Sequence, residues 1–296
     1  MRMWVVQDDE LPAYIAVWNA ITPEDPADVS QQRERRSRDG RRLYVLAELD
    51  GAAAGCGFAG PSQSERRGSL SPRVLPDARR RGVGTALLDE LTRHLAALGF
   101  ETASGAVDGA DEGSLAFARR HGFEEVDRQV EQIKAITTAE TPGDPPPGVE
   151  HVTLAERPEL LRESYDLASE GYADMATFVP VQITLEDWVG DDDNVLEGSF
   201  VALASGEIVG FSGLCRNQEG TFEDGLTVVR RAWRRRGVAE ALKREKLLWA
   251  SANGITEIVT WTQTGNESMR ALNERLGYVY GSVSITVCAS LGPPLA

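Results

Sequence analysis

Arg79-Arg80-Arg81-Gly82-Val83-Gly84-Thr85-Ala86-Leu87-Leu88 decides the fold, and the chain repeats this stretch as Arg234-Arg235-Arg236-Gly237-Val238-Ala239-Glu240-Ala241-Leu242-Lys243. The sequence predicts a hydrophobic strand before each copy and an amphipathic helix after it. Small residues let the backbone approach an anion closely, and the free amide groups at the start of a helix donate to phosphate oxygens. Arginine side chains add charge-assisted hydrogen bonds. Each copy therefore predicts a phosphate-binding loop.

The two copies belong to a longer duplication. The offset 237 − 82 = 155 also relates further pairs, which are Gly51 and Gly206, Gly55 and Gly210, Val74 and Val229, and Gly122 and Gly277. A period of this length indicates duplication of a whole domain, because the repeats of solenoid proteins span only roughly 20–50 residues. A chain of 296 residues is long enough for two domains.

A stretch rich in proline and glycine marks the predicted domain boundary. Residues 141–148, with the sequence TPGDPPPG, sustain neither a helix nor a strand ladder and are typical of a semi-rigid linker. We therefore expect an N-terminal domain over residues 1–140, the linker over 141–148 and a C-terminal domain over 149–296.

The composition excludes several classes of partner. The net charge is −15 and the pI is about 4.8, whereas non-specific binding to nucleic acid requires a basic surface. Acidity favours cationic partners, although solubility is the simpler explanation. No window reaches the roughly 18 apolar residues of a membrane span, so we expect a soluble, cytoplasmic protein. Three cysteines and three histidines without ligand spacing predict neither a disulfide framework nor a metal site.

Both halves predict the same order of elements: a strand, two helices, three antiparallel strands, a helix, a strand, a helix and a final strand. In the second half, residues 200–203 and 208–211 form a predicted hairpin across Ser205-Gly206, and residues 226–229 lead into the basic loop. The expected fold class is α/β, with a mixed sheet in each of two tandem domains.

These motifs resemble those of the GNAT superfamily of N-acetyltransferases. The signature of that family, [Arg/Gln]-x-x-Gly-x-[Gly/Ala] after a strand, is matched by Arg79, Gly82 and Gly84 and again by Arg234, Gly237 and Ala239. A second element, a short helix that ends in Leu-Gly-Phe/Tyr, is matched by His121-Gly122-Phe123 and Leu276-Gly277-Tyr278. The resemblance covers nearly the whole chain twice and implies two tandem GNAT-like acyl-CoA N-acyltransferase domains.

The resemblance implies acetyl-CoA as the cofactor. Its pyrophosphate is expected on the amides that start the helix after each loop, and its pantetheine arm is expected to pair with the end of the preceding strand, because such folds splay the fourth and fifth strands. In the first half the residues expected to bind it are Val74, Leu75, Pro76, Arg79, Arg81, Gly82, Val83, Gly84 and Thr85. In the second half they are Val229, Arg230, Arg231, Arg234, Arg236, Gly237, Val238, Ala239, Glu240, Asn266 and Asn273.

The resemblance also implies direct transfer of the acetyl group to a primary amine in a ternary complex. The site must accept a proton from the ammonium form of the acceptor and polarise the thioester carbonyl. Glu223 and Asp224 lie on the strand before the second loop, where this family often places a glutamate base. The alternative is that each carboxylate merely faces solvent at a strand end. The amide of Val229, or of Val74 in the first half, is the expected oxyanion donor.

The two halves are not equivalent as sites. Positions 223 − 155 = 68 and 224 − 155 = 69 hold Gly68 and Ser69, so the first half lacks a matching base. Pro72 interrupts the fourth strand there and requires an open edge, because proline has no amide hydrogen. We expect catalysis in the C-terminal domain, and an N-terminal domain that binds coenzyme A without turnover.

The general acid is less evident. In this family a tyrosine four residues before the late glycine often protonates the leaving thiolate, whereas this chain has Ala118 and Asn273 there. An asparagine is not acidic enough for that step, although its carboxamide is able to bond the cofactor. Water or Tyr278 is the remaining donor, and a tyrosine at this position also fits a role in the core. Asn266 is expected to cap its helix and to contact the cofactor arm.

The acceptor is expected between the strands and the early helices of the second half. Tyr172, Asp174, Met175, Phe178 and Trp188 combine aromatic and acidic side chains, which suit a cationic amine of a small molecule or peptide. Packing between the helices explains these residues equally well. The missing tyrosine favours a second hypothesis, a non-catalytic acyl-CoA-binding or sensing protein.

Overall fold

The chain folds into two compact units. The computed structural model describes residues 1–23, 26–62, 66–175, 183–190, 193–216 and 221–292. Unit 1 comprises Met1–Val126 with Ile285–Ala296, and unit 2 comprises Asp127–Ser284. The boundaries differ from the predicted 1–140 and 149–296, because β6 (Glu124–Ala135) pairs with a strand of unit 2, whereas the end of β12 (Val279–Ser290) neighbours a strand of unit 1.

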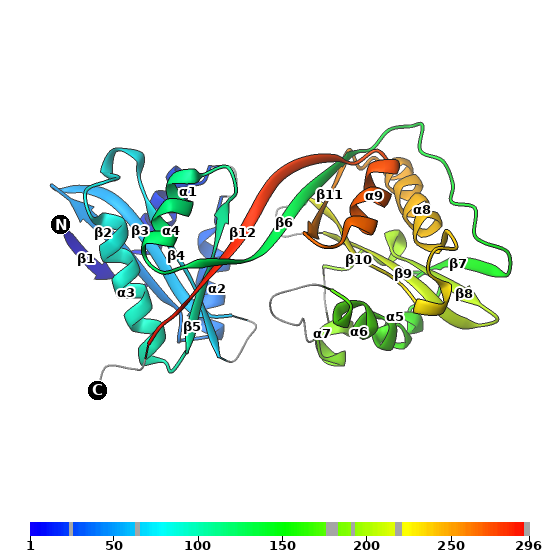
Figure 1. Ribbon diagram of the computed structural model, residues 1–296, viewed down its shortest axis with the longest axis horizontal. Coiled ribbons are helices and arrows are strands. Elements are labelled where there is room, and N and C mark those ends of the chain that lie inside the picture. Colours follow the sequence, from blue (N-terminus) through cyan, green and yellow to red (C-terminus); the bar gives the residue numbers. More distant parts are fainter. Residues whose placement is uncertain (24–25, 63–65, 176–182, 191–192, 217–220, 293–296) are drawn as a thin grey trace. The chain divides into compact units, whose positions relative to one another are not determined.

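Unit 1 contains one sheet with helices on both faces (Figure 1). Its strands run in the order β1-β2-β3-β4-β5-β12. Helix α1 packs on one face, against Tyr44 and Cys56, and α3 packs on the other, where Gly55 and Gly57 lie against Leu87. The elements are β1 (Arg2–Val5), α1 (Leu11–Ile21), α2 (Val29–Arg38), β2 (Leu43–Leu49), β3 (Ala52–Pro61), β4 (Arg67–Val74), η1 (Pro76–Ala78), α3 (Val83–Ala97), β5 (Thr102–Asp108) and α4 (Glu112–Arg120).

Unit 2 repeats this arrangement. Its strands run in the order β12-β6-β11-β10-β9-β8-β7, with α8 and α9 on one face and α5 to α7 on the other (Figure 1). Its further elements are β7 (Val149–Thr153), α5 (Glu159–Glu163), α6 (Tyr165–Ala173), α7 (Leu185–Val189), η2 (Leu196–Gly198), β8 (Phe200–Ala204), β9 (Glu207–Arg216), β10 (Phe222–Val229), η3 (Arg231–Trp233), α8 (Val238–Ala252), β11 (Glu257–Gln263) and α9 (Glu267–Arg275).

The backbone reproduces the duplication at the positions that need unusual dihedral angles. The hairpin turns have φ +55° at Asp50 and +52° at Ser205, each followed by a left-handed glycine. The basic loops have φ +62° at Arg80 and +59° at Arg235, two residues before the glycines that start α3 and α8. The predicted hairpin and the predicted whole-domain duplication are both confirmed.

In each unit the fourth and fifth strands pair briefly and then diverge. Among the described residues, β4 pairs with β5 over residues 67–69 alone, and β10 pairs with β11 at residues 222 and 223 alone. The rest of β4 and β10 has an open edge on that side, as the resemblance implies. Pro72 lies in the divergent part of β4, which explains why a residue without an amide hydrogen is tolerated there.

Residues 141–148 do not separate the two units. They lie within unit 2, where the segment packs along α8: the Gly143 amide donates to Glu245 Oε1 (2.9 Å), and Arg244 Nη1 donates to Thr141 Oγ1 (3.3 Å). A Cβ on Gly143 would lie 2.0 Å from the carbonyl oxygen of Ala241, so only glycine fits against the helix. The predicted linker is a fixed connection between β6 and β7.

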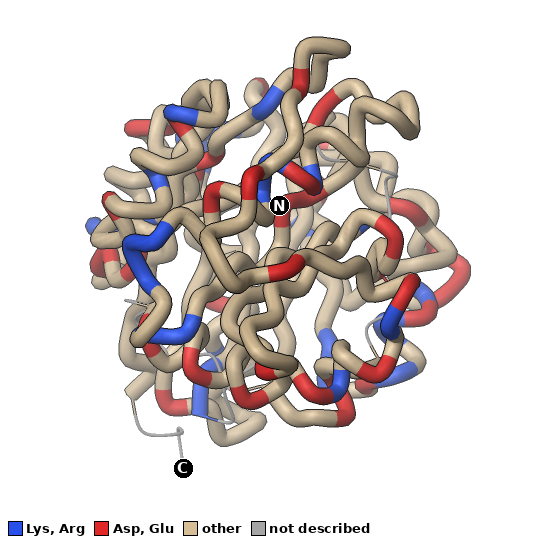
Figure 2. The backbone as a smooth tube through the Cα atoms, turned by 90° about the vertical axis from the view of Figure 1, so that its right-hand side faces the viewer, with Lys and Arg blue, Asp and Glu red and all other residues tan. Residues whose placement is uncertain are grey.

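Acidic residues are spread along the described ranges (Figure 2). Within the described ranges, no helix combines the length and apolar character that crossing a membrane requires. The same ranges contain no group of three or more His, Cys, Asp or Glu side chains placed to hold a metal ion.

Candidate active site

The two basic loops open the backbone at the start of α3 and α8. Gly82 and Gly237 occupy the N-cap positions with φ +86° and +88°, and neither helix start has a side-chain cap. A Cβ on either glycine would meet no heavy atom within 4 Å. Helix-start amides without a side-chain cap suit an anion such as a diphosphate, so the residues present fit the predicted cofactor.

The signature arginines fasten these loops to the strands that precede them. Arg79 Nε donates to the carbonyl oxygen of Val74 (3.3 Å), and Arg234 Nε donates to that of Val229 (2.9 Å). The sequence predicted both arginines as phosphate ligands and gave no sign of this contact. Because it occurs in both units, it explains why the motif begins with a long donor side chain.

Strand geometry separates the predicted backbone donors into two groups. The amides of Leu75 and Arg230 donate to Ala54 and Val209 on the neighbouring strand, at 3.0 and 2.9 Å. Since successive residues of a strand point their amides to opposite edges, the Val74 and Val229 amides face the divergent edge. Those two remain candidates for the cofactor arm or the oxyanion. Pro76 has no amide hydrogen, and the Arg231 amide donates to Glu170 Oε1 (3.2 Å).

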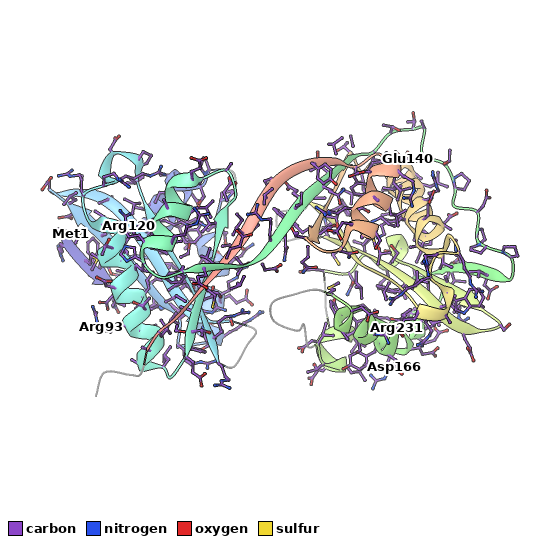
Figure 3. All side chains as sticks on the ribbon, viewed as in Figure 1. Met1, Arg93, Arg120, Glu140, Asp166 and Arg231 are labelled. Carbon is purple, nitrogen blue, oxygen red and sulfur yellow. The ribbon has the colours of Figure 1, made fainter. Side chains whose placement is uncertain are left out.

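Carboxylates at the C-terminal end of α6 pair with the arginines of the second loop. Asp174 lies between Arg231 and Arg234 (2.5 Å to Arg234 Nη2), and Glu170 lies 3.7 Å from Arg230. Figure 3 shows Arg231 beside this helix. Hydrogen bonds from Arg231 and then Arg234 lower the pKa of Asp174 to about 2. In the described part of unit 1, Arg81 pairs with Asp50 (2.5 Å) and no carboxylate pairs with Arg79.

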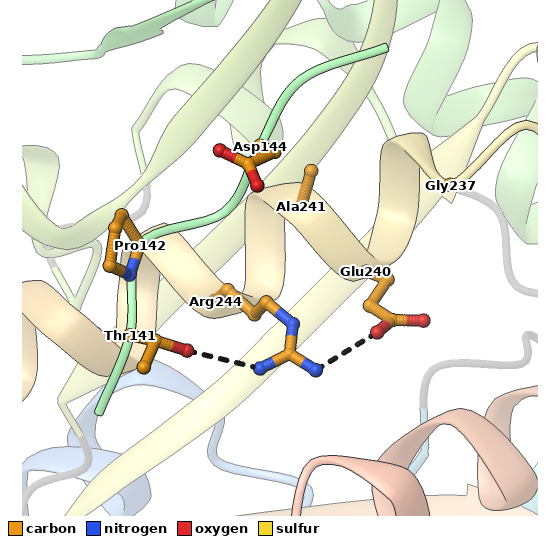
Figure 4. A pocket seen from close by; sticks show the side chains of 7 residues that line it. All are labelled: Thr141, Pro142, Asp144, Gly237, Glu240, Ala241 and Arg244. Carbon is orange, nitrogen blue, oxygen red and sulfur yellow. Dashed lines mark hydrogen bonds and ion pairs between the residues drawn. The ribbon is translucent and has the colours of Figure 1, made fainter. Parts of the chain in front are cut away.

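The side chains of the remaining loop residues have contacts of their own within the fold. Val83 and Val238 are buried in the core, and the Gly84 backbone lies against Phe117, at the position that Ala239 fills in unit 2. Thr85 Oγ1 lies 3.3 Å from His121 Nε2, and the Arg236 guanidinium stacks on Trp233 at 4.9 Å. A cavity of about 500 Å³ adjoins the second loop (Figure 4), lined by Thr141, Pro142, Asp144, Gly237, Glu240, Ala241 and Arg244.

Asp224 is not a candidate base, contrary to the expectation from sequence. Its side chain is 1% exposed, forms ion pairs with Lys243 and Lys246 of α8, and accepts a hydrogen bond from the Tyr278 hydroxyl (3.0 Å). Burial alone raises the pKa of this carboxyl, but the two ammonium groups outweigh burial and hold it far below its usual range. A sealed, fully paired carboxylate cannot take a proton from an acceptor.

Glu223 points to the opposite face of β10. Side chains alternate along a strand, so the contact of Asp224 with α8 turns Glu223 toward the face that α6 covers. Glu223 is half-buried beside Val259 of β11, at the point where the two strands diverge. Burial, and then the charge of Asp224, raise the pKa of Glu223. A carboxylate with a raised pKa at an open strand edge has the properties of a general base.

The strand pairing also corrects the match between the halves. Ser69 pairs with Ser104 of β5, and Glu223 pairs with Val259 of β11. Ser104 and Val259 are matched positions of the two halves, because 259 − 104 = 155. Glu223 therefore occupies the place of Ser69, not of Gly68, because β10 contains one extra residue in a bulge between Asp224 and Thr227. Unit 1 still has no carboxylate at this place.

The other predicted polar contacts belong to the core of unit 2. Tyr278 is 3% exposed, and burial and the neighbouring Asp224 raise its pKa well above the usual value, so it is not placed to donate a proton to a thiolate. Asn273 is fully buried, and its Nδ2 donates to Gln132 Oε1 (2.9 Å). Asn266 caps α9 through the Met269 amide (3.4 Å).

The predicted acceptor residues largely pack the helices. Trp188 is buried, packs edge-on against Phe211 and donates to the carbonyl oxygen of Leu161 (2.8 Å). Tyr172 packs edge-on against Trp188, and the carboxylate of Asp174 is held by arginines. Phe178 lies outside the described residues.

Comparison with known proteins agrees with this geometry. The model of the acetyltransferase (GNAT) family matches residues 4–123 and 159–278. No curated protein matches the sequence significantly. Among solved structures, a GCN5-related N-acetyltransferase from Sphaerobacter thermophilus is 20% identical with a TM-score of 0.80, over 99% of this chain and 96% of that one. A tandem GNAT protein from the clavulanic acid biosynthesis pathway is 17% identical with a TM-score of 0.72, over 99% of each chain.

The family model covers the larger part of the chain in two segments, each with its own loop and diverging strands. A match of this extent supports acyl-CoA-dependent transfer of an acyl group to an amine-bearing acceptor. The chain therefore belongs to the GNAT family of acetyltransferases and contains the domain of that family twice.

Proposed function

We propose that the protein is an acetyl-CoA-dependent N-acetyltransferase of the cytoplasm whose turnover takes place in unit 2. The observation that carries this proposal is the difference at one matched position: Glu223 lies where β10 and β11 diverge, whereas unit 1 has Ser69 there. Unit 1 keeps an open loop at Gly82 and is proposed to bind coenzyme A without turnover.

Each proposed role follows from the place of its residue in the structure. Bound acetyl-CoA supplies the activated acyl group as a thioester. The amides at Gly237 to Glu240 hold its diphosphate, and the Val229 amide donates to the oxygen on which negative charge develops. Glu223 accepts the proton of the acceptor ammonium, directly or through one water. Tyr278 and Asn273 are engaged in the core, so the leaving thiolate takes its proton from water.

The acceptor that fits best is a primary amine that is protonated in solution. Glu223 is the carboxylate presented to the acceptor face, and in the described part of the chain Asp174 and Glu170 are occupied by arginines. An amine that arrives as an ammonium ion is attracted by Glu223 and transfers a proton to it. A small molecule or a peptide N-terminus meets this requirement.

The test is a thiol-release screen of amines with acetyl-CoA, run beside thermal shift and calorimetry. We expect coenzyme A to bind and at least one amine to release thiol, with Glu223→Gln binding coenzyme A normally while releasing no thiol above background. If coenzyme A binds but none of the amines releases thiol, the result would favour the alternative, an acyl-CoA-binding or sensing protein. That alternative is supported by the ion pairs of Asp174 with Arg231 and Arg234 of the second loop. Absence of coenzyme A binding would remove both.

A further inference from the structure

The buried ionic cluster of unit 2 has an apolar counterpart in unit 1. The cluster consists of Asp224, Lys243, Lys246 and Tyr278, and its side chains are almost completely buried. It holds two of the three lysines in the sequence, all other basic residues apart from histidines being arginines. Each member has one matched position in unit 1, so the cluster can be compared with the equivalent residues of the same chain.

The matched positions are all hydrophobic. The offset 243 − 88 = 246 − 91 = 278 − 123 = 155 gives Leu88, Leu91 and Phe123. The fourth match comes from strand pairing: Asp224 pairs with Leu214, and Leu70 pairs with Ala59. Because 214 − 59 = 155, Leu70 is the counterpart of Asp224. These four residues are at most 5% exposed. The same fold is therefore built without ions here, and burying charge in place of well-packed apolar groups is usually neutral or unfavourable for stability.

Unit 2 differs from unit 1 at this place in the path of its fourth strand. Strands β3 and β4 pair in one continuous register from Gly55 and Val74 to Pro61 and Gly68, whereas β10 has its bulge immediately after Asp224. Gly213 of β9 lies opposite the bulge, where the ladder is interrupted. A buried carbonyl at such a point needs a donor.

The cluster supplies that donor and fixes β10 directly before the bulge. Lys246 Nζ donates to the Gly213 carbonyl oxygen (2.7 Å) and to the Asp224 carboxylate. Thr260 Oγ1 of β11 donates to the backbone oxygen of Asp224 (3.1 Å). Lys243 and Tyr278 complete the contacts of that carboxylate. The residue directly before this fixed point is Glu223.

We propose that Asp224, Lys243, Lys246 and Tyr278 are positioning residues, which fasten the bulge of β10 and thereby hold Glu223 toward the acceptor face. The assignment rests on the proposed function, because it needs Glu223 to act as the base. It explains why unit 2 keeps a costly ionic cluster where unit 1 has leucine and phenylalanine. A shift of about 1 Å at a reacting group is enough to lower a rate roughly 100-fold.

The test replaces the cluster with the residues that unit 1 itself uses: Asp224→Leu, Lys243→Leu, Lys246→Leu and Tyr278→Phe together. We expect this quadruple variant to fold and to bind coenzyme A with unchanged affinity. Its Tm is expected to change little, because removing the cost of buried charge offsets the loss of the donor to the Gly213 carbonyl. With the acceptor found in the screen, we expect kcat to fall at least tenfold while KM for acetyl-CoA stays within twofold. An unchanged kcat in the folded variant would overturn the assignment while leaving the proposed function intact.

Two further measurements keep the assignment testable under other outcomes. Carboxyl carbon NMR is expected to show a different titration of Glu223 in the quadruple variant than in the wild type, because the variant removes Asp224, which acts on Glu223, and releases the strand that holds it. An identical titration of Glu223 in both proteins would overturn the assignment even without turnover. If the quadruple variant does not fold, Tyr278→Phe removes only the hydroxyl contact; an unchanged kcat and an unchanged pH profile in that variant would count against the cluster.

Discussion

Replacing Asp224 with asparagine tests whether its ion pairs are as buried as the structure shows. The substitution keeps the shape of the side chain and removes its charge. Lys243 and Lys246 then lose their counter-charge at positions where their side chains are 2% and 0% exposed. Breaking a buried pair by removing one partner costs about 3–5 kcal/mol. At roughly 2–4 °C per kcal/mol, the transition of unit 2 is expected to fall by roughly 6–20 °C.

The pH dependence of this loss gives a second, independent measurement. Burial already lowers the pKa of Lys246 from 10.5, and the charge of Asp224 opposes that effect. Without this charge the folded-state pKa falls further, so the folded variant binds fewer protons than the unfolded chain. Stability then rises with pH through this range. The difference in Tm between Asp224→Asn and wild type is therefore expected to narrow between pH 7 and pH 10.

Differential scanning calorimetry of both proteins at several pH values makes the comparison. Glu223→Gln is the matched control, because it removes the neighbouring carboxylate of β10, which has no ammonium partner in the described structure. Its Tm is expected to stay within about 2 °C of wild type, since substitutions without such partners usually change stability by less than 0.5 kcal/mol. A loss below about 3 °C for Asp224→Asn, or a loss that is constant from pH 7 to 10, would refute the reasoning.

Three further predictions follow from the loops and the candidate base. Because burial and Asp224 raise the pKa of Glu223, kcat is expected to rise with pH through a pKa above the usual value for glutamate. Glu223→Gln should lower kcat by roughly 10²–10⁴-fold and abolish that rise. If kcat of this variant still rises with pH in the same way, another residue is the base. The double variant Glu170→Gln with Asp174→Asn should tighten coenzyme A binding to unit 2 by about tenfold in calorimetry, because Arg231 and Arg234 then lack their carboxylates. Asp166→Asn, a substitution on α6 outside these ion pairs, is the control and should leave the affinity unchanged. Equal effects of the two changes would mean that the net charge of the protein, and not the release of these arginines, determines the affinity. Gly82→Ala and Gly237→Ala should each lower the free energy of unfolding in urea by about 1–2 kcal/mol, because both glycines have left-handed backbone angles and open space around them. Clearly unequal losses for the two variants would contradict the matched geometry of the two loops.

The sequence was sufficient for features that repeat or that depend on local rules. Glycines and arginines at one constant offset predicted the two loops, and Ser205-Gly206 between apolar runs predicted the hairpin, which the φ angles confirm. These features depend on neighbours within a few residues, which a sequence displays directly.

The sequence failed where a residue depends on a distant strand. Asp224 looked like a strand-end carboxylate, and its burial depends on lysines about twenty residues later and on Tyr278 of another element. The bulge that shifts the match of Glu223 from Gly68 to Ser69 leaves no mark in an ungapped alignment, because only strand pairing reveals it. The proline-rich segment 141–148 gave the right local conformation and the wrong role, since its packing on α8 depends on Gly143 and Glu245.

The exchange of strands determines how the protein can be divided for experiments. A fragment that ends at residue 140 would carry β6 without its partner β11, and its own β5 would lack the neighbour that β12 provides. Both would present unpaired backbone groups, which promote aggregation. Separate study of unit 1 therefore calls for a fusion that returns residues 285–292 to its sheet, and a circularly permuted chain is a rational route to it.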